Sequence, residues 1–394
     1  MRLNIYKPTL LIVLLFHAVC INLPYINGYG MIQYLFLLIT GIFLLFRYRT
    51  FKRNPFHSVN IWMLFYIGMV IVSSYINRNA VTERQVLLVA IIFAVKIVEI
   101  FFLFEFFAIK GKFKELISTL FYLTLFYCVL SDITLLVFPN LHVQKGMYYL
   151  IGNKFELSYL HLQLLVLFLQ RQKNKGVTSK AVGNNVLFIT LGVLSLFICS
   201  KIDCSTGIIG VVLLFVFYFL NFEKKEQFKK PFTFFAILFI AASVLLLFSS
   251  IVTWEPIRYL IVDVLHKDIT LTGRLNIYSK LHLVFNNHIL LGYGLGSSYE
   301  VSMKLISGPN TQNGILEVIL EQGVLSLGLL LIVVYKVFKF NSKNANFTYL
   351  ILILYIYALF ASIEITLNLS FITWLALLLV AKYTPLQKKE RLEG

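Results

Sequence analysis

The stretch VLLVAIIFAVKIVEIFFLFEFFA, residues 86–108, decides the fold class of this chain. It is long enough to cross a bilayer as a helix, because about 20 apolar residues span a hydrocarbon core roughly 30 Å thick. Backbone amides find no water partners in that core, so a helix is the expected spanning form. Buried charges at such a position are costly and therefore indicate a functional role, but Lys96 and Glu99, at i and i+3, could instead pair with each other among packed helices, and Glu105 lies beyond them.

The rest of the chain repeats this pattern. Of its 394 residues, 59% are hydrophobic and 13% charged, and the mean hydropathy is +0.82, which separates it from soluble domains. We predict an all-α polytopic membrane protein that forms a single integral membrane domain over residues 1–394. About twelve transmembrane helices are expected, near residues 9–26, 30–46, 59–77, 86–108, 115–137, 156–170, 185–200, 206–222, 232–253, 315–335, 347–363 and 369–383.

The basic residues predict the orientation of these helices. The net charge of +17 comes from Lys and Arg residues that punctuate the apolar runs, rather than from one soluble patch that would indicate nucleic acid as a partner. The two termini and the connectors on their side carry 24 Lys and Arg residues, whereas the opposite connectors carry 10. Because short cytoplasmic loops are enriched in Lys and Arg, both termini should be cytoplasmic and the long connector 254–314 external.

Cysteine usage indicates neither a disulfide framework nor a metal site. Cys20, Cys128, Cys199 and Cys204 lie in or beside apolar segments, without CxxC spacing and without accompanying histidines. We therefore expect no cofactor.

The external segment 254–314 is the only connector long enough to have a structure of its own. Pro256 favours a first helical turn, and apolar residues recur at helical spacing as far as Leu265. A second apolar stripe runs from Ile277 to Phe285 and predicts a short amphipathic helix that lies on the outer leaflet. Glycines at every second position of GYGLG, residues 292–296, then break helical order.

Two stretches of the chain together resemble a known family. TGRLNIYSKLHLVFNNHILLGYGLGS (272–297) and PNTQNGILEVILEQGVLSLGLLL (309–331) are similar to the external loop and following span of the O-antigen ligase and polymerase superfamily, especially Wzy-type polysaccharide polymerases. The matching positions are Gly273, Arg274, Leu290, Leu291, Gly292, Gly294, Gly296, Asn313, Leu316, Glu317, Glu321 and Gly323. Gln312 stands where the family has a histidine, and Asn287 and His288 precede the Leu-Leu-Gly where a proline is usual.

The resemblance implies glycosyl transfer in a bacterial cytoplasmic membrane. An undecaprenyl-diphosphate-linked glycan would donate its chain, at the outer face, to a hydroxyl of a second lipid-linked repeat unit of a capsule, O-antigen or exopolysaccharide. The enzyme would be a metal-independent, inverting glycosyltransferase. Its partners would be the two lipid-linked substrates, membrane lipids, a chain-length regulator and a flippase.

The chemistry of this transfer indicates which residues could carry it. Arg274 is the first candidate, because a guanidinium group can bind a diphosphate bidentately and stabilise the charge that develops on it. Further outward cations could bind the same diphosphates, although single interfacial Lys and Arg residues more often contact lipid headgroups. They are Arg258, Lys154, Lys201, Arg84 and Arg78.

The attacking hydroxyl needs a base or a hydrogen-bond partner. Glu317 is the candidate base, although a carboxylate in a first helical turn also stabilises the helix dipole, and Asp203 is the alternative. Gln312 and Asn313 could bind sugar hydroxyls or a phosphate oxygen without changing their protonation state. His266, His282 and His288 also lie in the external segment, where histidines are mostly polar-face residues.

Two other functions stay open. A flippase or transporter for lipid-linked oligosaccharides would also have about twelve helices and a basic cavity, but such proteins show two related halves and broken helices. The sequence shows no obvious duplication. An O-antigen ligase of the same superfamily would use a different acceptor, and a scaffold protein is a more distant alternative.

Overall fold

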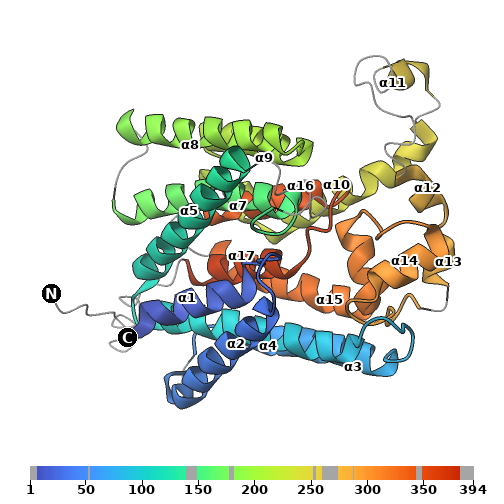
Figure 1. Cartoon of the computed structure of the whole chain (residues 1–394), viewed down its shortest axis with the longest axis horizontal. Coiled ribbons are helices and arrows are strands. Elements are labelled where there is room, and N and C mark those ends of the chain that lie inside the picture. The colour runs from blue at the N-terminus through green and yellow to red at the C-terminus, as the bar shows by residue number, and fades with distance from the viewer. Residues whose placement is uncertain are drawn as a thin grey trace.

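The computed structural model describes residues 7–51, 54–138, 149–176, 182–251, 254–259, 274–286, 288–342 and 348–381. Over these residues the secondary structure is helical, without a strand (Figure 1). A helix coincides with every apolar segment predicted from the sequence. These helices are α1 (Lys7–Val19), α2 (Tyr29–Phe46), α3 (His57–Ile76), α4 (Val86–Ile109), α5 (Phe113–Val137), α7 (Lys154–Asn174), α8 (Val182–Lys201), α9 (Ser205–Phe219), α10 (Pro231–Ile251), α15 (Gly314–Ser342), α16 (Leu350–Phe360) and α17 (Leu369–Val380).

Five of these helices are long and apolar enough to cross a membrane: α2, α3, α4, α5 and α15. Of the other helices, α7 has polar residues at both ends. The apolar stretches described in α1, α8, α9, α10, α16 and α17 are shorter than the 18 residues needed to count as a candidate span. The chain is thus an all-helical, multi-pass membrane protein, and the number of twelve crossings stays a prediction.

The remaining elements are short. Among the described connectors, 3-10 helices occur at η1 (Tyr48–Phe51), η2 (Phe222–Lys224) and η3 (Glu226–Lys229). Within its described residues, the segment 254–314, predicted to be external and called the external segment below, contains α11 (Glu255–Tyr259), α12 (Arg274–Ser279), α13 (Leu281–Phe285) and α14 (Ser298–Ile306). The expected continuation of α11 towards Leu265 lies outside the described residues.

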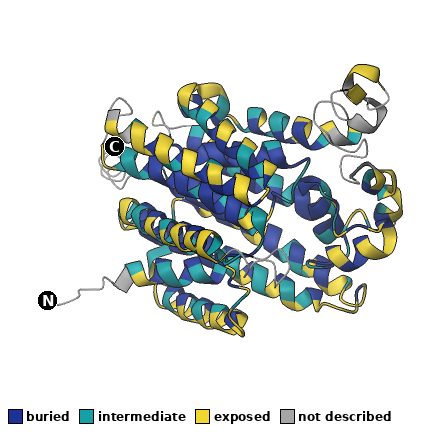
Figure 2. Ribbon diagram, turned by 45° about the horizontal axis from the view of Figure 1, so that its top comes forward, coloured by how far each residue is buried: buried dark blue, intermediate teal, exposed yellow. Residues whose placement is uncertain are grey.

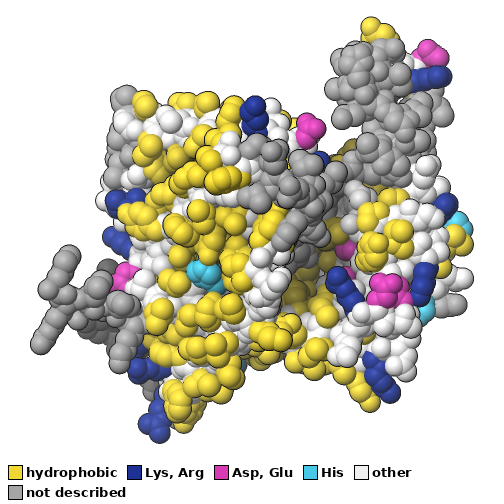
Figure 3. Space-filling view, in the orientation of Figure 1, with side chains coloured by type: hydrophobic (Ala, Val, Ile, Leu, Met, Phe, Trp, Pro, Cys, Tyr) yellow, Lys and Arg dark blue, Asp and Glu magenta, His cyan; other side chains and the backbone are white. Residues whose placement is uncertain are grey.

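The centre of the bundle is formed by α16 and α17. Nearly every residue of both helices is buried, as expected of helices that are apolar on all sides (Figure 2). By contrast, α2 exposes Met31, Leu45 and Phe46, each more than 70% accessible. Figure 3 shows apolar side chains over the middle of the molecule and charged ones towards its two ends. This distribution fits a bundle whose flanks face lipid.

The short helices of the external segment gather at one end of the bundle. There α12 lies beside α10 and α13, and α13 and α14 lie towards the end of α3 and the beginning of α15 (Figure 1). Helix α1 begins, and α17 ends, at the opposite end of the bundle. The long connector and the two ends of the described chain are therefore on opposite sides of the fold.

Candidate functional site

A break in α15 lies beside the glycine-spaced turn of the external segment. At Gly323 the backbone leaves helical geometry, with φ of +79° and ψ of 167°. The N–H of the next residue, Val324, therefore donates to the Ile289 carbonyl at 2.9 Å instead of to its own helix. A Cβ atom at Gly323 would lie 2.1 Å from the Leu290 carbonyl oxygen, so this approach of two backbones requires glycine.

The same turn is also bound to α3. The Ser73 hydroxyl donates to the Leu291 carbonyl, and the N–H of Leu295 donates to the Ser74 hydroxyl at 3.0 Å. Irregular backbone within an apolar bundle is stable only where protein groups satisfy its hydrogen bonds, and these contacts meet that condition. The turn is thus part of the packed bundle.

The predicted amphipathic stripe of the external segment faces the protein. Ile277 in α12 and Val284 in α13 are buried in one apolar cluster with Val86, Val301 and Leu320. The stripe therefore packs the short helices against the beginnings of α4 and α15, rather than lying on a lipid surface as we expected from the sequence. The cause is the turn at 288–297, which folds the segment back against the bundle.

One tyrosine connects the external segment to the residues before α15 and α17. The Tyr278 hydroxyl lies 3.2 Å from the carbonyl oxygen of Gln312 and 3.0 Å from that of Ser362. In addition, the N–H of Gly314 donates to the Ala361 carbonyl at 2.7 Å. The beginning of α12, the loop before α15 and the loop before α17 consequently meet at one place.

Among the candidate site residues, Asn313 stabilises the start of α15. It is fully buried, its Oδ1 accepts from the N–H groups of Ile315 and Leu316 at the start of α15, and its Nδ2 donates to the Ala242 carbonyl at 2.9 Å. This is the geometry of a helix N-cap. Gln312, one residue earlier, is half-buried with a φ of +54°, and its side chain makes no hydrogen bond to the described part of the chain.

The two glutamates of α15 point towards different parts of the same loop system. Glu317 is buried, and its Oε2 accepts from the N–H and the hydroxyl of Thr311 at 3.0 and 2.7 Å. Glu321 is half-buried, and its Oε1 accepts from the N–H of Gly296 at 3.0 Å. The Arg84 guanidinium lies within electrostatic range of Glu321. Glu317 thus orders the loop before α15, while Glu321 binds the glycine-spaced turn and lies within reach of the charge of Arg84.

The other candidate cations lie on several different elements. Lys154, at the start of α7, donates from Nζ to the Asp203 carbonyl at 3.2 Å, and Lys201, at the end of α8, lies over the Phe197 ring. Arg258 is exposed on α11. Arg78 lies over the Tyr75 ring. Arg274 is the first residue of α12, and its side chain lies outside the described residues.

The histidines of the external segment do not share one environment. His288 stacks on Tyr293, with ring centroids 4.0 Å apart. His282 is exposed, and its Nδ1 lies 3.2 Å from the Ser279 carbonyl oxygen. His266 lies outside the described residues.

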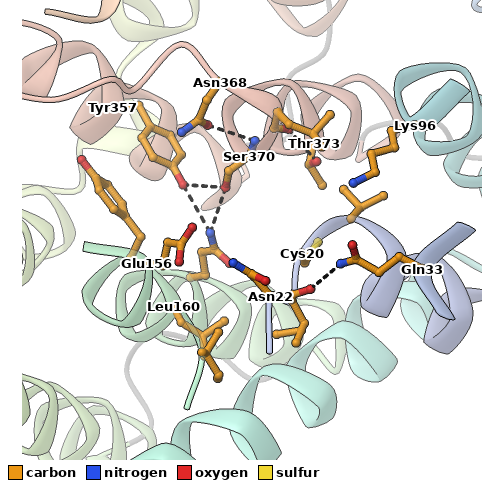
Figure 4. Close-up of a pocket in the computed structure, with 16 residues that line it drawn as sticks. Cys20, Asn22, Gln33, Lys96, Glu156, Leu160, Tyr357, Asn368, Ser370 and Thr373 are labelled. Carbon is orange, nitrogen blue, oxygen red and sulfur yellow. Dashed lines mark hydrogen bonds between the residues drawn. The ribbon is translucent and has the colours of Figure 1, made fainter. Parts of the chain in front are cut away.

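A second candidate site is a cavity of about 500 Å³ between the helices (Figure 4). It is lined by the end of α1 and by residues of α2, α4, α7, α16 and α17. The residues whose side chains contribute amide, hydroxyl or charged groups are Asn22, Gln33, Lys96, Glu156, Tyr159, Gln163, Tyr357, Asn368, Ser370 and Thr373. Its size is within the range of roughly 300–1,000 Å³ found for small-molecule sites.

Hydrogen bonds organise one wall of this cavity. Gln163 Nε2 donates to the hydroxyls of Tyr357 at 3.3 Å and Ser370 at 3.0 Å, and these two hydroxyls lie 2.9 Å apart. Tyr159 stacks on Tyr357, with ring centroids 5.0 Å apart. The sequence offered one signal for this site, namely glutamines such as Gln163 inside apolar runs, but it gave no indication that these runs would meet.

Lys96 and Glu99 do not pair as their spacing suggested. The Lys96 ammonium group points into the cavity (Figure 4). Glu99 is buried and accepts a hydrogen bond from the Thr40 hydroxyl on α2. The two side chains thus have different surroundings although they are only three residues apart on α4, and no ion pair to Lys96 occurs within the described residues.

A buried hydrogen-bonded chain elsewhere has the residue types of a hydrolase triad. His161 Nε2 lies 3.1 Å from Asp132 Oδ1, and its Nδ1 lies 3.2 Å from Ser195 Oγ. His161 and Ser195 are each only 1% exposed, so no substrate reaches the hydroxyl in this conformation. The arrangement connects α5, α7 and α8 and has a packing role.

The chain was compared with protein-family models, curated proteins and solved structures, and nothing matches. Within the described ranges, no three His, Cys, Asp or Glu side chains are placed to hold a metal ion. The fold and the sites together define a helical, multi-pass membrane protein. It has a structured connector bound to one end of the bundle and a polar cavity between its helices.

Proposed function

We propose that the protein is a membrane glycosyltransferase that joins lipid-linked oligosaccharide repeat units, as a polysaccharide polymerase of the Wzy type does. The sequence resemblance over 272–297 and 309–331 is the starting point of the proposal. The observation that carries it is the packing of the 290–296 turn against the break at Gly323, with the start of α12 next to the loop before α15. The resembling stretches, which are separate in sequence, are thus parts of one structural unit.

In this proposal the unit binds the donor diphosphate and positions the acceptor hydroxyl. The hydroxyl oxygen attacks the anomeric carbon of the donor sugar, the bond from that carbon to the diphosphate breaks, and the electron pair leaves with the diphosphate. Arg274 and Arg84 are the cations proposed to stabilise that leaving group. The hydroxyl proton passes to a carboxylate, for which Glu317 and Glu321 are the candidates. Asn313 contributes by fixing the start of α15.

The first test is replacement of Arg274. In a deletion strain complemented with variants, Arg274→Ala should abolish long polymer, because loss of one positioned donor to developing charge costs about 100-fold or more in rate. Arg274→Lys should restore little, since an ammonium group does not reproduce the guanidinium fork. The readout is polymer length on a gel, with protein level measured in the membrane fraction.

Lys280→Ala is the matched control for this test. Lys280 is an exposed cation between α12 and α13, six residues from Arg274, and its loss should leave polymer length unchanged. Normal polymer from Arg274→Ala at a normal protein level would remove Arg274 from the site.

A transporter of lipid-linked saccharides is the second candidate function. The discontinuity of α15 at Gly323 and the polar cavity between the helices are both features of transporters. The two functions differ in what purified protein does in proteoliposomes. A transporter moves a lipid-linked saccharide across the bilayer without lengthening it, whereas a polymerase yields a ladder of longer products.

A further inference from the structure

The cavity of Figure 4 has a polar mouth and a closed floor. Asn22, Glu156 and Asn368 are exposed and surround its opening, whereas Leu160 and Thr373 are buried. Solutes can therefore enter past these three exposed polar side chains. None of the lining residues comes from the connector 254–314, so this cavity is distinct from the unit that contains the α15 break.

Its hydrogen-bonding groups suit a polyol. Gln163 and Gln33 are held through their Nε2 atoms, Gln33 by donating to the Ile21 carbonyl at 2.8 Å, and neither Oε1 atom makes a hydrogen bond to the described part of the chain. Two fixed amide oxygens can accept from hydroxyl groups. The stacked tyrosines, Tyr159 and Tyr357, add an apolar face with polar edges, which matches the alternating C–H and O–H faces of a sugar ring.

The charges around the cavity favour an anion on that sugar. Glu156 lies at the mouth, but its carboxylate accepts from the N–H of Asn153 at 2.9 Å and belongs to the capping box of α7, where the helix N-terminus offsets its charge. Lys96 has no such compensation within the described residues and points into the cavity. A half-buried, unpaired ammonium group is well placed to meet a negative group of a ligand.

We propose that this cavity binds a saccharide that carries a negative charge, with the anion at Lys96 and the ring against Tyr159 and Tyr357. The anion is either a phosphate on the anomeric oxygen or a carboxylate on the ring. The assignment rests on the proposed function, which it deepens by giving one of the two saccharide substrates a binding site. Residues 361–370 connect the two sites, because this segment meets Tyr278 and Gly314 at one end and supplies Asn368 and Ser370 to the cavity at the other.

A single cysteine at the mouth can report occupancy. In purified Cys20→Ser/Asn22→Cys protein, the exposed position 22 should react with N-ethylmaleimide, while the other native cysteines are buried. The probes are glucose 1-phosphate, glucuronate and neutral glucose. Glucose 1-phosphate, glucuronate or both should slow the reaction at concentrations at least about fivefold lower than glucose, the difference expected from one charge-assisted contact.

Three variants identify the source of this preference. Lys96→Gln should abolish the advantage of charged over neutral sugar, and Lys96→Arg, which retains the charge, should keep it. Lys110→Gln is the matched control, because Lys110 is an exposed cation at the far end of the same helix and its loss should change nothing. Comparison of Lys96→Gln with Lys96→Arg separates loss of charge from loss of fold.

Each outcome decides something about the cavity. Protection by glucose 1-phosphate alone supports a phosphate next to the lipid, and protection by glucuronate alone supports a ring carboxylate. Absence of protection by every probe, equal protection by glucose, or a charge preference that survives Lys96→Gln would overturn the assignment. Binding is measured without transfer, so proteoliposomes that yield no ladder of longer products while protection is intact would reject the polymerase reaction and not this site.

Discussion

Glu300 is the residue that attaches the external segment to the loop between α3 and α4. Its carboxylate lies 2.6 Å from Lys304 Nζ, 2.9 Å from the N–H of Glu83 and about 3 Å from the N–H and hydroxyl of Thr82. The Lys304 ammonium group and the backbone N–H groups lower the pKa of Glu300 to about 2 from its ordinary value of 4.5. The ionised form is thus the one that the fold stabilises.

This pKa shift gives the protein a defined acid sensitivity. A lowered folded-state pKa stabilises the fold fully above the ordinary value of 4.5, and this contribution disappears as the pH falls from 4.5 towards 2. Glu300→Gln should therefore lower the melting temperature at pH 7 and remove part of the further decrease between pH 5 and pH 3. The measurement is thermal unfolding of detergent-purified protein at several pH values.

Glu255→Gln, at an exposed acidic residue of α11, is the control and should leave the melting temperature at pH 7 unchanged. If Glu300→Gln and the unaltered protein lost stability in parallel from pH 5 to pH 3, the carboxylate would not be the group that titrates.

At the level of single residues, sequence reasoning indicated where a loop joins a helix and left the roles of the residues there open. Asn313 and Glu317 belong to a loop-to-helix boundary that hydropathy already indicates, and asparagine is a frequent N-cap. The bond from Asn313 to Ala242 in α10, however, joins residues 71 apart in the chain. No local pattern contains that contact, so an asparagine that we considered as a sugar ligand is in fact oriented by α10 and α15.

Among the elements, α15 differs most from a simple spanning helix. Beyond Gly323 its remaining part, Val324–Ser342, is about 28 Å long at 1.5 Å per residue and can nearly cross a bilayer by itself. The part before the break, Gly314–Gln322, packs with the turn at 290–296 and bears both candidate carboxylates. The break thus divides a membrane-crossing part from a part that shapes the proposed site.

Gly323→Ala should disrupt this junction. The added Cβ would meet the Leu290 carbonyl at 2.1 Å, and the residue would keep a positive φ that costs about 1–3 kcal/mol for other amino acids. We expect a clear decrease in thermal stability and loss of polymer together. Gly328→Ala in the same helix is the control, because a Cβ there meets nothing within 4 Å. It should be neutral or stabilising by up to about 1 kcal/mol. Equal melting temperatures for the two variants would show that the turn does not pack against the break.

Hydropathy predicted the positions of the helices because the apolar composition of a segment is a local property. All twelve apolar segments are helical in the structure. The break could be suspected from Gly323 but not placed against a partner, since its partner Leu290 is 33 residues away in another apolar run. The cavity could not be predicted from the sequence for the same reason. Gln33, Gln163 and Ser370 come from three distant helices, and only the packing of α2, α7 and α17 brings them together.

In the whole molecule, the two candidate sites belong to the same end of the bundle. The segment 361–370 contacts the external connector through Ser362 and reaches the cavity through Asn368 and Ser370. Both sites can therefore serve one reaction only if this end faces the side of the membrane where lipid-linked sugars are exposed. The charge bias of the connectors predicts that this is the outer side.

Two cysteine substitutions test this orientation in intact cells. Ser279 in α12 and Gln227 in η3 are both exposed and uncharged, and the predicted topology places them on opposite sides of the membrane, separated by α10. Ser279→Cys should react with a membrane-impermeant thiol reagent in intact cells, whereas Gln227→Cys should react only after permeabilisation. Reaction of both in intact cells would mean that α10 does not cross the membrane. Reaction of Gln227→Cys alone would place the connector 254–314 in the cytoplasm, where the proposed transfer between outer-leaflet substrates has no access to it.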